Sequence, residues 1–239
     1  MPEAGTYSAQ VHGLTEGKET CRAEVNRLVL DMAGDTGIAH IDGLSLPAAA
    51  GYQEMDLYRS AEAAGISSHF TCVERDLGVH VRMKYANLPP AVDYNNCSFE
   101  DQLSRLRKSR TMLDWFWFDS CGHALSYAKL DGSNLQTFID ALKGNLKPVG
   151  IGFFTAGVMP YRMMSASDQY AICTGNRIDD VSHDQMMGAY LDILRKELPK
   201  DFDICSDIRY KVVSGHVFFM LGVSKNWWGH PPHKPVEVF

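Results

Sequence analysis

The chain has 239 residues and a formal net charge of −6, with 45% hydrophobic and 22% charged residues. This length suits one large or two small domains, and the acidic balance argues against broad electrostatic adhesion to nucleic acid. No apolar run approaches the ~20 residues that cross a bilayer. The first ten residues, MPEAGTYSAQ, lack the basic and apolar regions of a signal peptide. We therefore expect a cytoplasmic protein without a membrane partner.

Apolar residues at helical spacing alternate with short apolar runs typical of buried strands. In chain order, the first half predicts a helix over 15–26, a strand over 27–34 ending near Asp31, a Gly-rich loop over 33–51, a helix over 52–65, a strand over 69–74 and a helix over 75–88. The second half predicts a short segment at 91–96, a helix over 99–110, a strand over 113–119, a helix over 133–146, a strand over 149–155, a helix over 183–198 and a hairpin of 205–213 with 216–224.

Several residues mark the ends of these elements. Gly65 suits a helix end because glycine tolerates positive φ, and Pro89 and Pro90 stop the helix before them. Ser98 with Asp101 resembles a capping box for the next helix. These signals support the boundaries given above.

Alternating strands and helices predict a doubly wound, mostly parallel α/β sheet of Rossmann-like type, with helices on both faces and a C-terminal antiparallel hairpin. We expect a single domain over 1–239, with a substrate-side insertion at about 156–181 and a Pro-rich tail at 225–239. In such folds, ligands bind at the carboxyl ends of the strands. The polar residues that follow each strand are therefore the candidates for function.

Cysteines and histidines give little sign of cross-links or metal ligands. The six cysteines are Cys21, Cys72, Cys97, Cys121, Cys173 and Cys205, and none forms a C-x-x-C pair. This scatter favours reduced, structural thiols. His40 with Asp42 is a weak pair, and no recognised ligand spacing occurs. We expect no metal.

Four short motifs follow the strands: VLDMAGDTG, FTCVERD, VDYNNC and WFWFDSCG. Their order resembles the class I S-adenosylmethionine-dependent methyltransferases over roughly residues 25 to 224. In that family an acid and a Gly-rich turn follow the first strand, and an acid for the ribose ends the second. A polar residue near the adenine follows the third strand, and the fourth ends near the methyl donor. The resemblance implies a fold, an S-adenosylmethionine cofactor and methyl transfer.

The resemblance also implies a set of cofactor-binding residues, namely Asp31, Gly34, Gly37, Glu74, Arg75, Asn95 and Asn96. Glu74 either accepts hydrogen bonds from the ribose diol or merely marks a strand end. The asparagines either meet the adenine edge or serve the turn conformation. The first loop departs from the family pattern, with Ala33 and Asp35 where glycines are usual. The stretch LSLPAAAGYQE, stiffened by Pro47, is an alternative wall for the pocket.

At the fourth strand we expect Asp119 and Ser120 to be catalytic, holding a target amine or a water. The run lacks the Asp/Asn-Pro-Pro-aromatic motif of amino-methylating enzymes, and Cys121 lacks the Pro-Cys context of a nucleophile. We expect the acceptor to be a nucleic acid, slightly favoured by its frequency in the family, or a small molecule or protein side chain, which fit the acidic charge equally well. The basic cluster RLRKSR either contacts phosphates or, as we favour, complements a helix end.

Two alternatives to methyl transfer remain open. One is a catalytically inactive, methyltransferase-like binding or regulatory protein. The other is a nucleotide- or NAD-binding oxidoreductase, ranked last because no G-x-G-x-x-G follows the first strand. Trp227 and Trp228 in the tail suggest a homo-oligomer contact, a protein partner or a lid folded back on the core.

Overall fold

The computed structural model describes residues 16–46, 52–84, 89–125, 133–159, 165–212, 215–230 and 234–238. The helices are α2 (Glu16–Thr36), α3 (Tyr52–Ala63), α4 (Leu77–Lys84), α5 (Phe99–Ser109), α6 (Asn134–Asn145), α7 (Ala166–Thr174) and α8 (His183–Glu197). The strands are β1 (His40–Ser45), β2 (Ser67–Val73), β3 (Val92–Asn95), β4 (Leu113–His123), β5 (Leu146–Gly157), β6 (Phe202–Lys211), β7 (Val217–Lys225) and β8 (Val236–Val238).

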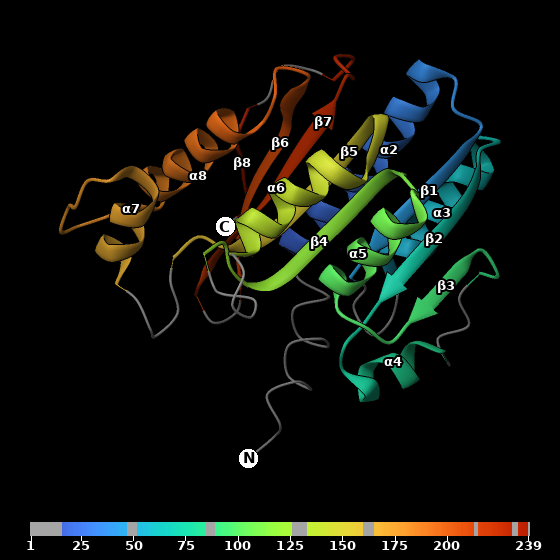
Figure 1. Cartoon of the computed structure of the whole chain (residues 1–239), viewed down its shortest axis with the longest axis horizontal. Coiled ribbons are helices and arrows are strands. Elements are labelled where there is room, and N and C mark those ends of the chain that lie inside the picture. Colours follow the sequence, from blue (N-terminus) through green and yellow to red (C-terminus); the bar gives the residue numbers. More distant parts are fainter. Residues whose placement is uncertain are drawn as a thin grey trace.

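These strands form one sheet in the order β3-β2-β1-β4-β5-β7-β6-β8 (Figure 1). β1 to β5 run parallel, and β7 pairs antiparallel with both β5 and β6. This arrangement confirms the expected mostly parallel sheet with a C-terminal antiparallel hairpin. Because the parallel strands point the same way, their carboxyl ends meet at one edge, which we call the carboxyl edge. The opposite edge is the amino edge.

Helices cover both faces of the sheet (Figure 1). α5, α6 and α8 pack on one face around buried side chains such as Phe116 and Phe154. α2 and α3 pack on the other face around Trp115 and Phe153. Gly43 of β1 is required here, since a Cβ at this position would lie 2.2 Å from the Trp115 indole. No helix in the described part of the chain is long and apolar enough to span a membrane.

The assignment of the first strand to 27–34 was wrong. Residues 16–36 form one helix, and β1 lies at 40–45, inside the expected loop. Buried residues Val25, Leu28, Val29 and Met32 follow a helical spacing that continues from Cys21. A short apolar run alone does not separate a buried helix segment from a strand, and the longer periodicity decides for the helix.

The predicted element ends are confirmed elsewhere. Gly65 has φ +72° after α3, and the Ser98 side chain accepts a hydrogen bond from the Asp101 N–H at the start of α5. Ser133 and Ser182 cap α6 and α8 in the same way. Within the expected insertion at 156–181, α7 packs on α8. The domain boundaries themselves stay a prediction.

The tail folds back on the core through one of its two tryptophans. Trp227 is buried, and its indole N–H donates to Asp35 Oδ2 at 3.0 Å, near the end of α2. Beyond it, β8 adds a parallel strand to β6. Of the alternatives for the tail, Trp227 follows the one that folds back on the core, because that side chain is packed inside the protein. Trp228 is 58% exposed, and its role in an interface stays a prediction.

Candidate functional site

Polar side chains lie at the carboxyl edge after four neighbouring strands. Ser45 ends β1, Glu74 follows β2, Asn95 ends β3 and Asp119 lies in the last part of β4. The order β3-β2-β1-β4 places these strand ends in one row. The structure thus brings the second, third and fourth predicted motifs to the same edge.

Glu74 is held by backbone groups at the end of β2. Its Oε1 accepts from the Asp76 N–H at 2.7 Å, while its own N–H donates to the Asn95 carbonyl at 3.1 Å. Partial burial raises the pKa of the Glu74 carboxyl. A half-buried, backbone-anchored carboxylate at a strand end is suited to accept hydrogen bonds from neutral hydroxyls.

The two asparagines bind neighbouring groups of the protein. Asn96 Nδ2 donates to the carbonyls of Glu74 and Arg75, at 2.7 and 3.3 Å, so it joins the ends of β2 and β3. Asn95 Nδ2 donates to Gln102 Oε1 at 3.4 Å. Asn96 therefore positions the backbone on either side of Glu74, and the Arg75 side chain is exposed.

Three predicted residues lie at the other edge of the sheet. Asp31 and Gly34 belong to α2, and Gly37 has φ +67° in the connection from α2 to the start of β1. Asp31 pairs with Arg27 one turn earlier, at 3.0 Å. The connection enters β1 at its amino end, so the structure does not bring these residues together with Glu74. The error follows from the wrong position of the first strand.

A buried acid of α3 lies against the end of β1, and the sequence did not reveal it. Ser45 Oγ donates to Glu54 Oε1 at 2.5 Å, and Glu54 lies in the first turn of α3 with 1% of its surface exposed. Burial raises the pKa of the Glu54 carboxyl, and its Oε2 has no hydrogen-bond partner among the described residues. The signal was the segment SLPAAAG at 45–51, whose small residues follow the true first strand.

Asp119 of β4 forms an ion pair with Lys18 from the first turn of α2. The Lys18 side chain is 10% exposed and that of Asp119 17%. The Lys18 ammonium also lies 5.6 Å from the centroid of the Trp117 ring and 5.9 Å from that of Tyr210. An ammonium ion, a carboxylate and two aromatic faces thus meet at the carboxyl edge.

This cluster, which we call the Lys18 pocket, has tightly packed walls. A Cβ on Gly17 would lie 2.4 Å from Tyr210, so glycine lets α2 approach β6 at this point. The Trp117 indole N–H donates to Thr155 Oγ1 at 2.8 Å, which fixes the ring between β4 and β5. Ser120 Oγ donates to the Thr155 carbonyl at 3.0 Å. Ser120 therefore stabilises the same corner.

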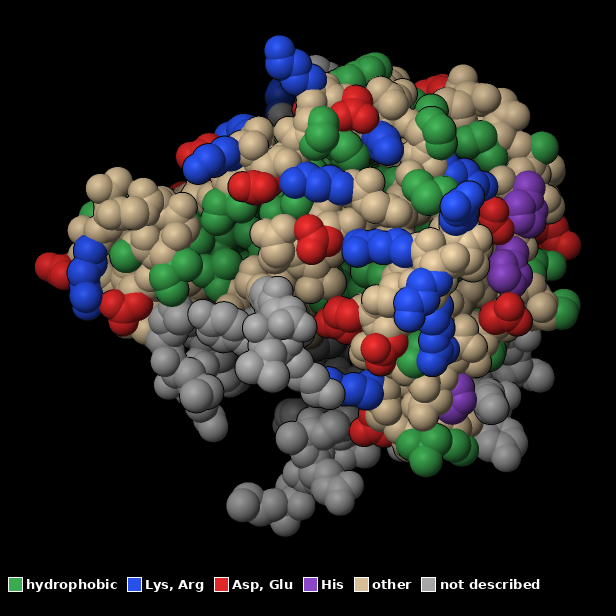
Figure 2. Space-filling view, viewed as in Figure 1, with side chains coloured by type: hydrophobic (Ala, Val, Ile, Leu, Met, Phe, Trp, Pro, Cys, Tyr) green, Lys and Arg blue, Asp and Glu red, His purple; other side chains and the backbone are tan. Residues whose placement is uncertain are grey.

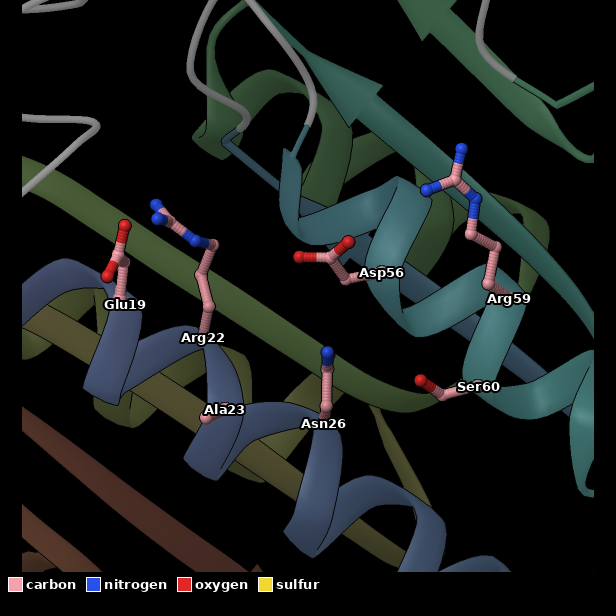
Figure 3. Close-up of a pocket in the computed structure, with 7 residues that line it drawn as sticks. All are labelled: Glu19, Arg22, Ala23, Asn26, Asp56, Arg59 and Ser60. Carbon is pink, nitrogen blue, oxygen red and sulfur yellow. The ribbon is translucent and has the colours of Figure 1, made fainter.

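A groove of about 610 Å³ runs between α2 and α3. It is lined by Glu19, Arg22, Ala23, Asn26, Asp56, Arg59 and Ser60. Arg22 and Asn26 extend from α2 and Asp56 from α3 into the space between the helices (Figure 3). Its charged and amide side chains provide both hydrogen-bond donors and hydrogen-bond acceptors. Among the described residues, no group of three or more His, Cys, Asp or Glu can hold a metal ion.

No family model and no curated protein matches the sequence. Solved structures do match the fold. A protein from Listeria monocytogenes described as a class I S-adenosylmethionine-dependent methyltransferase is 12% identical, with a TM-score of 0.54 over 95% of this chain and 67% of that one. A SAM-dependent methyltransferase from Agrobacterium tumefaciens is 14% identical, with a TM-score of 0.53 over 90% of this chain and 64% of that one.

A third structure, of SMU.776 in complex with SAH, is 12% identical with a TM-score of 0.51, covering 89% of this chain and 50% of that one. The chain thus spans half to two thirds of the length of these proteins. At such identities the likeness concerns the fold, and the chain has the class I methyltransferase fold that the motifs implied.

Proposed function

We propose that the chain transfers a methyl group from S-adenosylmethionine to an acceptor at the carboxyl end of β4. The observation that carries this proposal is the row of polar groups at the carboxyl edge, on a sheet of the methyltransferase order. Ligands of open α/β sheets bind at this edge. A carboxylate at Glu74 and a carboxamide at Asn95 match the chemistry of a ribose diol and an adenine edge.

Each strand end has its own task in this proposal. Glu74, anchored by the Asp76 N–H, accepts hydrogen bonds from the two ribose hydroxyls. Asn96 keeps the backbone of Glu74 and Arg75 in place, and the amide of Asn95 meets the base. The bound donor supplies an electrophilic methyl group on a sulfonium. What the protein adds is in-line placement of the acceptor and exclusion of water, which we assign to the Lys18 pocket.

Calorimetric titration with S-adenosylmethionine and S-adenosylhomocysteine tests the donor site. Native protein is expected to bind both, and Glu74→Ala to weaken binding by about 2 kcal/mol, or roughly 30-fold, through loss of charge-assisted hydrogen bonds. Glu62→Ala is the matched control, since Glu62 is an exposed acid near the end of α3 at the amino edge. Undetectable binding of either ligand to native protein at high micromolar concentration contradicts the proposal.

A catalytically inactive binding protein is the second candidate, and two observations favour it. Ser45 stands where the family pattern has an acid, and Asp119 is paired with Lys18. This candidate predicts that S-adenosylhomocysteine binds while no acceptor is methylated. A radiolabelled methyl donor supplied with acceptor mixtures separates the two candidates.

The basic cluster of α5 does not support a nucleic-acid acceptor at this edge. Lys and Arg side chains gather over α5, with acidic side chains among them (Figure 2). α5 leads from β3 into the start of β4, so the end of the helix lies at the amino edge. There Arg107 donates to Asn145 Oδ1 at 2.9 Å and to the Asp140 carbonyl at 2.8 Å. A role at the helix end accounts for this cluster.

A further inference from the structure

The Lys18 pocket holds a cation where the acceptor of the proposed reaction would lie. Lys18 itself is 8% exposed, and its ammonium meets the Asp119 carboxylate and the faces of Trp117 and Tyr210. A carboxylate combined with aromatic faces is a recognition site for alkylammonium groups. The present occupant comes from the protein's own chain.

The position of Lys18 on α2 works against local preference. It lies in the first turn, where the helix dipole favours anions, as Glu16 and Glu19 provide. A cation at this end costs about 0.3–1 kcal/mol. The first turn is also the part of a helix whose N–H groups lack intrahelical acceptors. Moving this turn to release Lys18 therefore breaks few backbone hydrogen bonds. The contacts with Asp119 and the two rings, and not the helix dipole, therefore account for the position of the ammonium.

The direction of charge flow in methyl transfer favours an amine in this pocket. When a neutral nitrogen attacks the sulfonium methyl, positive charge leaves the sulfur and develops on the nitrogen. A carboxylate and two ring faces stabilise positive charge where it develops. A hydroxyl acceptor would instead end neutral, so the carboxylate and the ring faces would stabilise its product less than an ammonium.

We propose that the acceptor is a primary alkylamine and that Lys18 occupies the acceptor pocket until the amine displaces it. This inference rests on the proposed methyl transfer from S-adenosylmethionine. The amine enters as an ammonium ion paired with Asp119 and gives up one proton to solvent. Its lone pair then forms the N–CH₃ bond while the C–S bond breaks and leaves its electron pair on sulfur. The products are S-adenosylhomocysteine and an N-methylammonium, which remains paired with Asp119.

A binding experiment on the full chain tests the pocket without any methyl donor. Lys18→Ala removes the internal occupant, and n-butylammonium serves as the probe, with 1-butanol as the neutral ligand of the same shape. We expect saturable binding of n-butylammonium to the variant, about tenfold tighter than to native protein, because no internal group has to leave. 1-Butanol is expected to bind neither protein measurably.

Two further variants sharpen this result. Lys18→Ala combined with Asp119→Asn is expected to lose amine binding. Lys225→Ala is the matched control, since Lys225 lies over the Phe202 ring at 5.5 Å at the amino edge, and it should bind the amine as native protein does. Equal binding of amine and alcohol, or full amine binding after Asp119→Asn, overturns the proposal.

Turnover gives the second measurement and also applies to native protein if Lys18→Ala does not fold. With S-adenosylmethionine, native protein at high n-butylamine concentration is expected to form N-methylbutylamine, detected by mass spectrometry, and Lys18→Ala to form it at about tenfold lower amine concentration. Bound S-adenosylhomocysteine without any N-methylbutylamine overturns the amine proposal. Failure to bind S-adenosylhomocysteine overturns the proposed function instead, and the amine-binding result stands separately.

Discussion

A double-mutant cycle on Lys18 and Asp119 measures how strongly the ion pair stabilises the fold. Lys18→Met keeps most of the side-chain length and removes the charge, and Asp119→Asn keeps the shape and removes the opposite charge. Each single variant leaves one charged group in a pocket where the two side chains are 10% and 17% exposed. The double variant leaves neither charge.

The expected magnitudes follow from this partial burial. Removing one partner of a fully buried pair costs about 3–5 kcal/mol, and exposed pairs contribute about 0–1 kcal/mol. With some water reaching Asp119, we expect each single variant to lose about 2–3 kcal/mol and the coupling energy to be about 2 kcal/mol. For a chain of this size, such losses lower Tm by about 5–10 °C.

Urea denaturation at pH 7, followed by circular dichroism, gives the four unfolding free energies of the cycle. Lys225→Met provides the control, since Lys225 contacts the Phe202 ring and forms no ion pair with the described part of the chain. It should cost less than about 1 kcal/mol. A coupling energy below about 0.5 kcal/mol would show that the two charges act independently, and the reasoning about the Lys18 pocket would fail.

Three other substitutions test buried contacts outside the Lys18 pocket. Glu54→Gln should leave stability unchanged near pH 4 and make the protein more stable than native protein as the pH rises above 4.5. Burial raises the folded-state pKa of the Glu54 carboxyl above that ordinary value, so unfolding of native protein releases a proton and native stability falls as the pH rises. A pH-independent difference in urea denaturation contradicts this. Trp227→Phe should cost about 1–2 kcal/mol, since it removes the indole hydrogen bond to Asp35; an unchanged Tm would show that the tail does not stabilise α2. Gly43→Ala should cost about 1–3 kcal/mol, because its Cβ would overlap the Trp115 ring; a native near-UV spectrum with full stability would contradict that overlap.

The fold class was predictable because most helices and strands are indicated by local sequence patterns. Serine caps, such as Ser98 and Ser133, and the apolar runs of β4 and β5 all agree with the final structure. β1 was missed for a physical reason. His40 and Asp42 lie on an exposed part of the sheet, at 49% and 31% side-chain exposure, so they interrupt the apolar run. Asp42-Gly43 also reads as a turn signal.

The site was predictable only where one residue marks a strand end. Glu74 and Asp119 follow apolar runs directly, and the structure places both at the carboxyl edge. Ser45 was not predicted, because the strand that it ends, β1, was itself missed. The ion pair of Lys18 with Asp119 joins residues 101 positions apart, and no local pattern connects them. Contacts of this kind depend on topology, which a single sequence does not supply.

The conflict between local preference and final structure is concentrated near one end of α2. A lysine in the first turn opposes the helix dipole, and a glycine beside it weakens the helix. Both fit once the tertiary contacts are considered, because Gly17 admits the Tyr210 ring and Lys18 meets Asp119. Local rules that are broken and then compensated at a ligand-binding edge are typical of functional sites. A pair worth about 2 kcal/mol would still be displaced by an amine whose own contacts with Asp119 and the rings exceed that value by a few kcal/mol.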